Sequence, residues 1–286
     1  MIISVASGKG GTGKTLVATS LALVLRERGP VTLLDCDVEE PNDYIYMKPA
    51  QTRSEPVAIP VPFVDESKCI GCGMCHDVCA FNAIVVLGKT VLVFKELCHG
   101  CGACTRFCPV GAITEVPNEI GVLEEGKVEG IRFFDGVLSI GQPMAPPIIR
   151  EVRKHAGVDG VTIIDASPGT SCPVVEAVRE SDFCILVTEP TPFGLNDLRL
   201  AVETVRELGL PHGAIINRAG VGDDRTEAYC LCEGIPILMT IPLEERIAHT
   251  YSRGVPLVEA LPEYRERFLE MFDRIGEMVN ERSRST

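Results

Sequence analysis

The stretch Ser7–Thr15, SGKGGTGKT, constrains the fold of this 286-residue chain more than any other feature. Before it, the apolar and β-branched segment 1–6 predicts a buried strand. After it, segment 16–29 combines good helix formers with a terminal glycine, which predicts a helix. A glycine loop that ends in Lys-Thr between a strand and a helix is the context of a phosphate-binding loop. We therefore expect a nucleotide site here rather than an ordinary glycine-rich turn.

The residue types in this loop suit phosphate binding. Glycines let backbone amides approach phosphate oxygens with no side chain in the way, and the helix N-terminus adds partial positive charge. Lys14 would bridge the outer phosphates, and the hydroxyl of Thr15 would bind Mg²⁺. The predicted nucleotide-binding residues of the loop are Gly8, Gly10, Gly11, Thr12, Gly13, Lys14 and Thr15.

Later apolar runs end in carboxylates that we expect at one edge of a sheet. Segment 31–35 predicts a buried strand that leads into Asp35 and Asp37. Segment 161–165 predicts another, which ends at Asp165. Ligands of parallel sheets bind beyond the carboxyl ends of the strands, so these carboxylates would face the phosphates. Asp35 either supports the metal or the loop, or simply caps a turn. The pattern predicts an α/β fold with a mostly parallel sheet flanked by helices.

A cysteine-rich segment between residues 65 and 115 nearly repeats itself with a shift of 29 residues. Each copy has the spacing C-x₂-C-x₂-C-x₃-C, the ligand run of bacterial two-cluster ferredoxins, whose fourth cysteine ligates the other cluster. We therefore expect two [4Fe–4S] clusters. The first would be bound by Cys69, Cys72, Cys75 and Cys108, and the second by Cys98, Cys101, Cys104 and Cys79. Zinc is the alternative, because C-x₂-C pairs also form zinc ribbons, but a zinc ion needs only four ligands.

We assign residues 59–118 to an inserted α+β domain of the bacterial ferredoxin type, and residues 1–58 and 119–286 to a discontinuous P-loop domain. Prolines are dense between residues 47 and 63, which stops helices and indicates a linker into the insert. Apolar runs around Gly88 predict a β-hairpin within the insert. An insert this short has little core of its own, so we expect its stability to depend on its metal centres.

With its additional lysine near the start of the loop, KGGTGKT resembles the P-loop of the MinD/ParA/nitrogenase-iron-protein superfamily. The resemblance covers nearly the whole chain. It implies a Mg²⁺-dependent ATPase that forms an ATP-dependent homodimer, or a heterodimer with a related ATPase. In such a dimer Lys9 would reach the nucleotide of the partner subunit, and Asp37 would orient the attacking water. The catalytic residues that it implies are Lys9, Lys14 and Asp37.

The same resemblance assigns roles to residues after later strands. The sequence DASPG at 165–169 is similar to the family's switch II, Asp-x-x-Pro-Gly. In that role Asp165 holds Mg²⁺ through water, and the amide of Gly169 senses the γ-phosphate. The Asn217-Arg218 pair resembles the family's adenine-recognising element, with Asn217 bonding the base. A turn asparagine is the alternative.

Composition limits the remaining partners. The 40 acidic against 27 basic residues give a formal net charge of −13, which argues against nucleic-acid binding. No apolar run is long enough for a membrane span, and a core strand from the first residue predicts that there is no secretory leader. Thirteen cysteines with metal-like spacing indicate a reducing cytoplasm. Whether Cys172 binds a further, labile metal is left open. For Cys230 and Cys232 we favour an ordinary helix, which would direct the two side chains apart.

Two hypotheses of function from different classes follow. In the first, ATP binding and hydrolysis switch a dimer between states that gate electron transfer through the clusters to a redox partner. In the second, the chain is a carrier or assembly factor that loads an iron–sulfur or other metal cluster onto a client protein, with ATP controlling docking. A third, spatial organisation of cell machinery as in MinD, fits the fold but leaves two clusters without a purpose.

Overall fold

The computed structural model describes residues 1–157 and 159–285. Within these residues the chain forms two compact units. Unit 1 comprises Met1–Ser54, Leu123–Val137 and Ile149–Thr286, and unit 2 comprises Glu55–Val122 and Leu138–Ile148. Residues 55–58, 119–122 and Leu138–Ile148, which were predicted to belong to the P-loop domain, group with unit 2.

Unit 1 is built on a largely parallel sheet. The strands of the sheet are β1 (Ile2–Ala6), β2 (Val31–Cys36), β3 (Ala50–Val64), β6 (Ile113–Val128), β7 (Ile131–Leu138), β8 (Val161–Ala166), β9 (Phe183–Thr188), β10 (His212–Ala219) and β11 (Ile237–Pro242). Only the beginning of β3, up to Ser54, and the end of β6, from Leu123, belong to unit 1. In the described residues their order is β11-β10-β9-β1-β8-β2-β7-β6-β3. All neighbours from β11 to β7 pair in parallel, which confirms the predicted sheet. β3 and β6 carry the chain into unit 2 and back.

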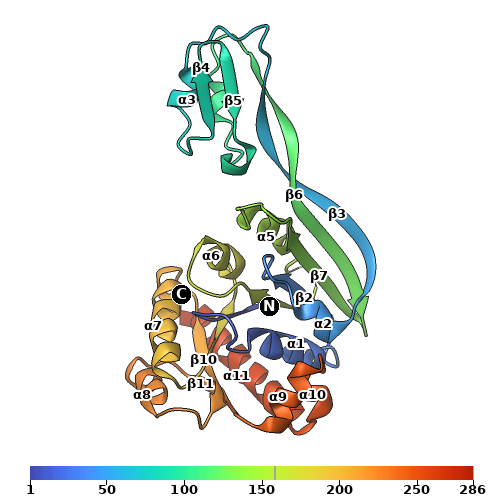
Figure 1. The fold of residues 1–286 in the computed structure, drawn as a ribbon. Helices are drawn as coiled ribbons and strands as arrows, with labels where there is room; N and C mark the ends of the chain where they lie inside the picture. Colours follow the sequence, from blue (N-terminus) through green and yellow to red (C-terminus); the bar gives the residue numbers. More distant parts are fainter. Residues whose placement is uncertain (158, 286) are drawn as a thin grey trace. The chain divides into compact units, whose positions relative to one another are not determined.

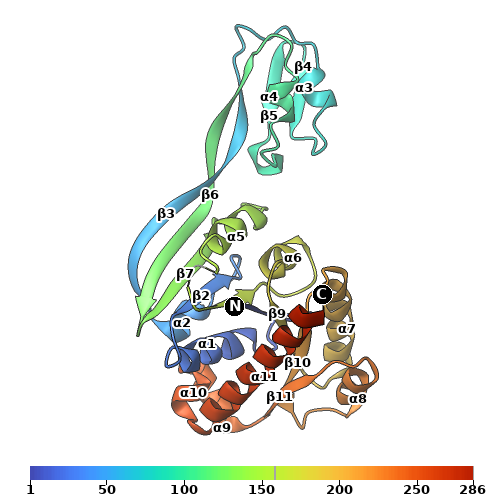
Figure 2. The ribbon, with the colours of Figure 1, turned by 180° about the vertical axis from the view of Figure 1, so that it is seen from behind.

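Helices cover both faces of this sheet. They are α1 (Lys14–Leu25), α2 (Asp43–Met47), α5 (Pro146–Arg153), α6 (Cys172–Val178), α7 (Pro192–Glu207), α8 (Arg225–Cys232), α9 (Glu245–Ser252), α10 (Leu257–Ala260) and α11 (Glu263–Ser285). α1 contacts β8 and α11 on one face, and α6 contacts β8 and β1 on the other (Figures 1 and 2). The predicted strand–loop–helix start of the chain is therefore confirmed, with the helix beginning at Lys14.

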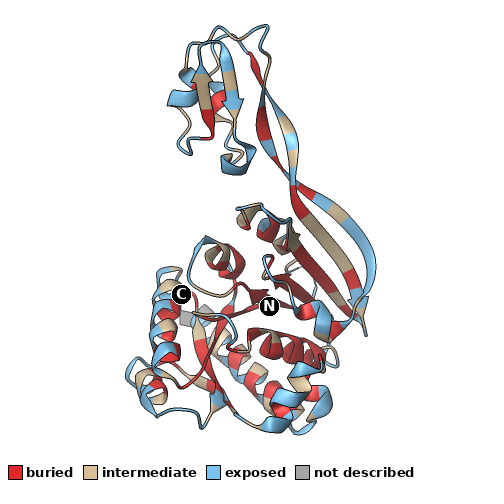
Figure 3. Ribbon diagram, viewed as in Figure 1, coloured by how far each residue is buried: buried red, intermediate tan, exposed pale blue. Residues whose placement is uncertain are grey.

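Burial follows the position of each strand within the sheet (Figure 3). Every residue of β2 and of β9 is buried, as expected for parallel strands covered by helices on both faces. α1 is buried along nearly its whole length, and it packs against both the sheet and α11. This packing fixes the carboxyl ends of β1, β2 and β8, from which the loops of the predicted site start.

Residues 47–63, which were predicted to be a linker or domain entry, include the point at which the chain enters unit 2, at Glu55, but they reach it as a strand. Residues Ala50–Val64 form β3, the last strand of the sheet. Proline is tolerated in an edge strand, where one row of backbone amides has no ladder partner. Because Pro56, Pro60 and Pro62 are separated by even numbers of residues, their nitrogens lie on the same side of β3.

Unit 2 contains a small set of short elements: α3 (Met74–Asp77), β4 (Ile84–Leu87), β5 (Thr90–Val93), a 3₁₀ turn at Lys95–Leu97 and α4 (Ala103–Arg106). β4 and β5 pair antiparallel with Leu87 opposite Thr90, so the predicted hairpin is confirmed. The buried core of this region is small, and cysteines supply much of it: Cys75, Ile84, Cys104 and Ile113.

Candidate functional site

The loop between β1 and α1 needs glycine at two positions. Gly13 precedes α1 with a φ of 101°, and a Cβ atom there would lie 2.4 Å from Nδ2 of Asn217. A Cβ atom on Gly8 would lie 2.1 Å from the carbonyl oxygen of Asp197. Only glycine permits both the left-handed backbone and such close approach. Lys14, the first residue of α1, is buried.

Thr15 and Asp165 lie together, as a shared Mg²⁺ site would require. The Thr15 hydroxyl donates a hydrogen bond of 2.6 Å to Oδ2 of Asp165, at the carboxyl end of β8. The other oxygen, Oδ1, is buried and has no hydrogen-bond partner among the described residues. Burial raises the pKa of Asp165 to about 7, although the positive charge of Lys14 opposes this rise. A cation placed here would therefore meet a carboxylate that lacks a full set of partners.

Asp35 supports the loop after β2. Its carboxylate accepts hydrogen bonds of 3.0 Å from the backbone amides of Asp37, Asn42 and Asp43. The residue is fully buried, so these three donors compensate for the loss of water. Of the three roles left open for Asp35, which are support of the metal, support of the loop and capping of a turn, these contacts favour support of the loop.

Acidic side chains gather around this loop. Burial, and then the charge of Asp35, raise the pKa of the partly buried Asp37 to about 7. Burial and Asp35 likewise raise the pKa of Asp135, on β7, to about 8. Asp135 is 3% exposed, and its Oδ1 has no hydrogen-bond partner within the described chain. Sequence patterns did not single out Asp135, because it comes next to Asp35 only through the pairing of β7 with β2 in the folded chain.

We expect this burial to make the protein less stable as the pH rises. Between the ordinary pKa of 3.8 and about 8, folded Asp135 retains a proton that the unfolded chain has released. The free energy of unfolding should therefore fall across this window, by up to about 1.4 kcal/mol per pH unit for one group. Asp135→Asn should flatten this slope, measured by anaerobic urea denaturation at pH 6 and pH 8. Equal slopes in the variant and the wild type would contradict the expectation.

Lys9 has an ion-pair partner within its own chain. Its ammonium group pairs with Oε1 of Glu189, the first residue after β9. Oε2 of Glu189 pairs with Arg218 at 3.0 Å. Burial opposes ionisation of Glu189, but the hydrogen bond to Lys9 and the charges of Lys9 and Arg218 outweigh it and lower its pKa. No local pattern predicts this contact, because the two residues of the Lys9–Glu189 pair are 180 positions apart.

Asn217 and Gly169 both contact the phosphate-binding loop. Asn217 donates from Nδ2 to the carbonyl oxygen of Thr12 at 2.7 Å, and it lines a pocket together with loop glycines and residues of α9. Gly169 has a φ of 100° and donates its amide to the carbonyl oxygen of Ser7 at 2.9 Å. The structure thus brings the adenine and γ-phosphate candidates to the same loop, whereas their contacts with a nucleotide stay predictions.

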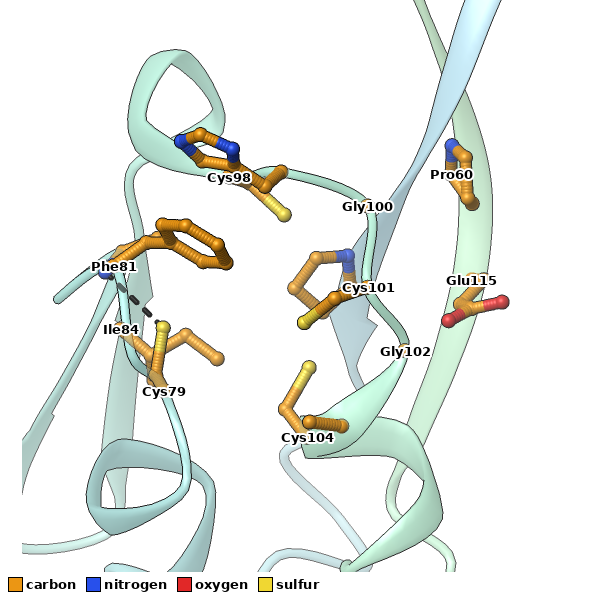
Figure 4. A pocket seen from close by; sticks show the side chains of 14 residues that line it. Pro60, Cys79, Phe81, Ile84, Cys98, Gly100, Cys101, Gly102, Cys104 and Glu115 are labelled. Carbon is orange, nitrogen blue, oxygen red and sulfur yellow. Dashed lines mark hydrogen bonds between the residues drawn. The ribbon is translucent and has the colours of Figure 1, made fainter. Parts of the chain in front are cut away.

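The eight cysteines of the two runs surround two separate hollows in unit 2. One hollow is lined by Cys69, Cys72, Cys75 and Cys108, and the other by Cys79, Cys98, Cys101 and Cys104. Figure 4 shows the four sulfur atoms of the second quartet around a common space. The fourth cysteine of each run thus lines the hollow of the opposite run. Among the described residues, no group of three or more His, Cys, Asp or Glu side chains forms a site for a single metal ion.

The two hollows differ in their surroundings. Cys79 Sγ accepts a hydrogen bond of 3.3 Å from the amide of Ala83, and Cys108 Sγ accepts one of 3.2 Å from Ala112, so the repeat is preserved in the backbone. Beside the second quartet, however, the rings of Phe81 and His99 stack with their centroids 3.6 Å apart. The corresponding positions beside the first quartet are aliphatic, Val110 and Ile70.

The remaining cysteines lie outside these hollows. On α8, Cys230 is buried and Cys232 is exposed, which confirms the expectation that a helix directs them apart. Cys172 is exposed at the first position of α6. No helix within residues 1–157 and 159–285 is both long and apolar enough to cross a membrane.

A glycine loop between β1 and α1, with Thr15 bonded to the aspartate at the end of a neighbouring parallel strand, defines a P-loop nucleotide-binding protein. The chain belongs to a known family of this class, because residues 3–257 match the model of the CobQ/CobB/MinD/ParA nucleotide binding domain.

Similar proteins span nearly the whole chain. An uncharacterized protein of Methanocaldococcus jannaschii is 31% identical over 89% of this chain and 90% of its own length, and a second one is 30% identical over 98% of each. The iron-sulfur cluster carrier protein of Aquifex aeolicus is 24% identical, over 97% of this chain and 68% of that protein. Among solved structures, the septum site-determining protein MinD from Pyrococcus horikoshii, complexed with Mg-ADP, has a TM-score of 0.61 at 21% identity and covers 97% of this chain and 96% of its own. The last similarity bears on the fold alone.

Proposed function

We propose that this protein is an ATPase in which a nucleotide switch controls electron transfer through two [4Fe–4S] clusters. The observation that carries the proposal is the arrangement of eight cysteines as two quartets around separate hollows, in the same chain as a P-loop. Membership of the CobQ/CobB/MinD/ParA family supports the ATPase half. The cysteine spacing supports the redox half.

The number and spacing of the cysteines favour clusters over zinc. A zinc ion needs only four ligands, whereas each run supplies three closely spaced cysteines and a fourth that follows after three residues. In a [4Fe–4S] cluster each thiolate binds a different iron atom at the edge of a larger body. Burial raises the pKa of the Cys104 thiol, and the neighbouring Cys98 and Cys101 raise it further. Iron would offset both effects by stabilising the thiolates.

The switch would work through hydrogen bonds that connect the loops of unit 1. When bound, Mg·ATP supplies the phosphate whose transfer to water drives the cycle. Lys14 would hold the outer phosphates, Thr15 and Asp165 would hold the metal, and Asp37 would orient the attacking water. The amide of Gly169 donates to Ser7 in this structure, so a γ-phosphate would compete for that donor. Exchange of this one hydrogen bond would move switch II with the state of the nucleotide.

The pair between Lys9 and Glu189 would restrain dimerisation. If Lys9 contacts the nucleotide of a partner subunit, it must first leave Glu189. Glu189→Gln should remove this restraint and tighten the ATP-dependent dimer by about fivefold to tenfold, the effect of a partly exposed ion pair worth about 1 kcal/mol. Analytical ultracentrifugation with a non-hydrolysable ATP analogue measures the change.

A matched control breaks a different ion pair of unit 1. Glu233→Gln removes the partner of Arg206, 2.7 Å away on the surface between α7 and α8, and should leave the dimer unchanged. Weaker dimerisation of Glu189→Gln would instead mean that Glu189 organises the interface.

The redox proposal is tested by anaerobic potentiometric titration of the clusters with no nucleotide, with ADP and with ATP. We expect ATP to shift at least one potential, or to change the rate of electron transfer to an acceptor protein. If every potential and rate is the same in the three states, the gating proposal fails even when ATP is hydrolysed.

Cluster transfer is the second candidate, and the similarity to the Aquifex iron-sulfur cluster carrier protein favours it. In that case an apo-ferredoxin acceptor should gain a cluster from the reconstituted protein, at a rate that depends on ATP. Clusters held by complete cysteine quartets should transfer slowly, whereas a labile third site would transfer quickly. Retention of all iron by the donor with ATP present would eliminate this candidate.

A further inference from the structure

A hollow of about 600 Å³ lies at the end of the sheet that β7, β6 and β3 form, and no step above uses it. Phe133, Asp135 and Val137 line it, because every second side chain of β7 points to the same face of the sheet. Tyr44 on α2 and Lys48, which follows α2, also line it. All residues around the hollow belong to unit 1, and none of them lines the pocket beside the phosphate-binding loop. The hollow is therefore a separate cavity within unit 1.

The size of the hollow suits a small organic molecule. Sites for such ligands usually measure about 300–1,000 Å³, whereas a water molecule in the liquid takes up about 30 Å³. The pocket beside the phosphate-binding loop, in comparison, measures about 230 Å³. A single metal ion with its waters would leave most of the larger hollow empty, so an organic ligand fits it better.

The charges of the lining favour a positive ligand. The lining contains the carboxyl groups of Glu124, Glu125 and Asp135, and against these the ammonium group of Lys48. Lys48 is exposed, and a long exposed side chain keeps its ammonium group in water, so it needs no anionic ligand. Neighbouring carboxylates disfavour one another's ionisation, and a cation placed between them removes this effect.

Asp135 is the buried acid of this lining. It is 3% exposed, and its Oδ1 has no hydrogen-bond partner within the described chain. Burial, followed by the charges of Asp35 and Glu124, raises its pKa to about 8. A cationic group beside Asp135 would oppose the effect of these two neighbours and allow the carboxylate to form. Asp135 thus offers a buried acceptor for a charged donor.

Aromatic and proline side chains supply the apolar part of the lining. Tyr44 is 50% exposed, and it lines the hollow together with Phe133, Pro41 and Pro49. The face of an aromatic ring attracts ammonium groups in addition to packing against apolar surface. A ligand that combines an apolar body with an ammonium group would match both parts of this lining.

We propose that this hollow binds a small organic ammonium ion, whose charged group pairs with Asp135 and Glu124 and whose apolar body packs against Tyr44. Such a ligand would contact α2 at Tyr44, at the end of the segment after β2 that contains Asp37. The site would exist with or without ATPase activity, because the hollow and the pocket beside the phosphate-binding loop share no lining residue.

Isothermal titration calorimetry of the full-length, reconstituted protein tests this site with phenylbutylamine, phenylbutanol and phenylbutyrate. The three probes share a phenyl ring on a short alkyl chain and differ in the charge of the head group. We expect the amine to bind with a Kd of about 1 mM or lower, about tenfold more tightly than the alcohol, because only the amine pairs with Asp135 as a cation. Phenylbutyrate should not bind. An amine that does not saturate the protein at about 10 mM, or that binds no better than the alcohol, would overturn the proposal.

Variants of two acids locate the bound amine. Asp135→Asn should bind phenylbutylamine about tenfold more weakly and phenylbutanol as the wild type does. Glu124→Gln, at a half-buried position of β6, should also weaken the amine, and it decides the result if Asp135→Asn does not fold. Glu233→Gln removes an acid on the surface between α7 and α8 and should keep wild-type affinity. Wild-type affinity of both Asp135→Asn and Glu124→Gln would mean that the amine does not bind in this hollow.

A non-hydrolysable ATP analogue separates this site from the nucleotide pocket. A saturating concentration of the analogue should leave phenylbutylamine bound, because the two pockets share no lining residue. Competitive displacement of the amine would place it in the nucleotide pocket and overturn the proposal. A protein that binds the amine through Asp135 but does not bind the analogue would instead contradict the proposed ATPase and leave this site standing.

Discussion

Replacing Cys104 with serine should remove one of the two clusters and lower the iron content from about eight to about four atoms per chain. Cys104 belongs to the small buried core of unit 2 and lines the second hollow. Its loss should therefore also loosen the packing around Ile84 and Ile113. Anaerobic reconstitution followed by iron analysis and electron paramagnetic resonance measures both the stoichiometry and which signal disappears.

The identity of the lost signal tests whether the fourth cysteine of each run binds the cluster of the other run, which we call the crossed arrangement. Cys79→Ser should abolish the same signal as Cys104→Ser, and Cys108→Ser should abolish the same signal as Cys75→Ser, because each pair lines one hollow. If the fourth cysteine of each run served its own run, Cys79→Ser would match Cys75→Ser instead. Cys232→Ser, on the exposed surface of α8, is the control and should retain both clusters. A colourless wild type after reconstitution would refute the cluster proposal.

Gly13→Ala should weaken ATP binding by about 100-fold. The new methyl group would lie 2.4 Å from Asn217 Nδ2 and would occupy a backbone with a φ of 101°. Strain of about 1–3 kcal/mol must then be relieved by moving the loop or Asn217, and each 1.4 kcal/mol corresponds to a factor of ten in affinity. Isothermal titration calorimetry with Mg·ATP measures the loss.

Gly276→Ala is the matched control for this substitution. Gly276 lies in α11 with nothing within 4 Å of the added methyl group, so alanine should preserve nucleotide affinity and slightly stabilise the helix. Affinity of Gly13→Ala within a factor of two of the wild type would mean that the loop adapts without cost and that its glycine is not required.

Local patterns in the sequence were sufficient to predict the frame of the fold. The strand–loop–helix around Lys14, the buried strands before Asp35 and Asp165, and the hairpin at Gly88 each depend on periodicity and turn chemistry within a few residues. The repeat of the cysteine runs also predicted which thiols would gather, since a fixed spacing limits where each sulfur can point. These are features that near neighbours in the chain decide.

Other features depend on contacts between distant segments and were missed. Prolines suggested a linker where β3 forms, because their effect depends on whether a strand lies at the edge of a sheet. The partner of Lys9, Glu189, lies after another strand. Asp43 and Asp135 look like ordinary surface acids in the sequence, and only the packing of α2 and β7 shows that they are buried.

The crossed quartets also constrain how the protein is made. The second hollow takes cysteines from position 79 and from positions up to 104, and the first needs Cys108. During translation, neither set of four thiols would be complete until nearly the entire cysteine-rich segment had left the ribosome. Cluster insertion would therefore follow synthesis of this segment as a late event, and a nascent chain released before residue 104 could mature neither centre.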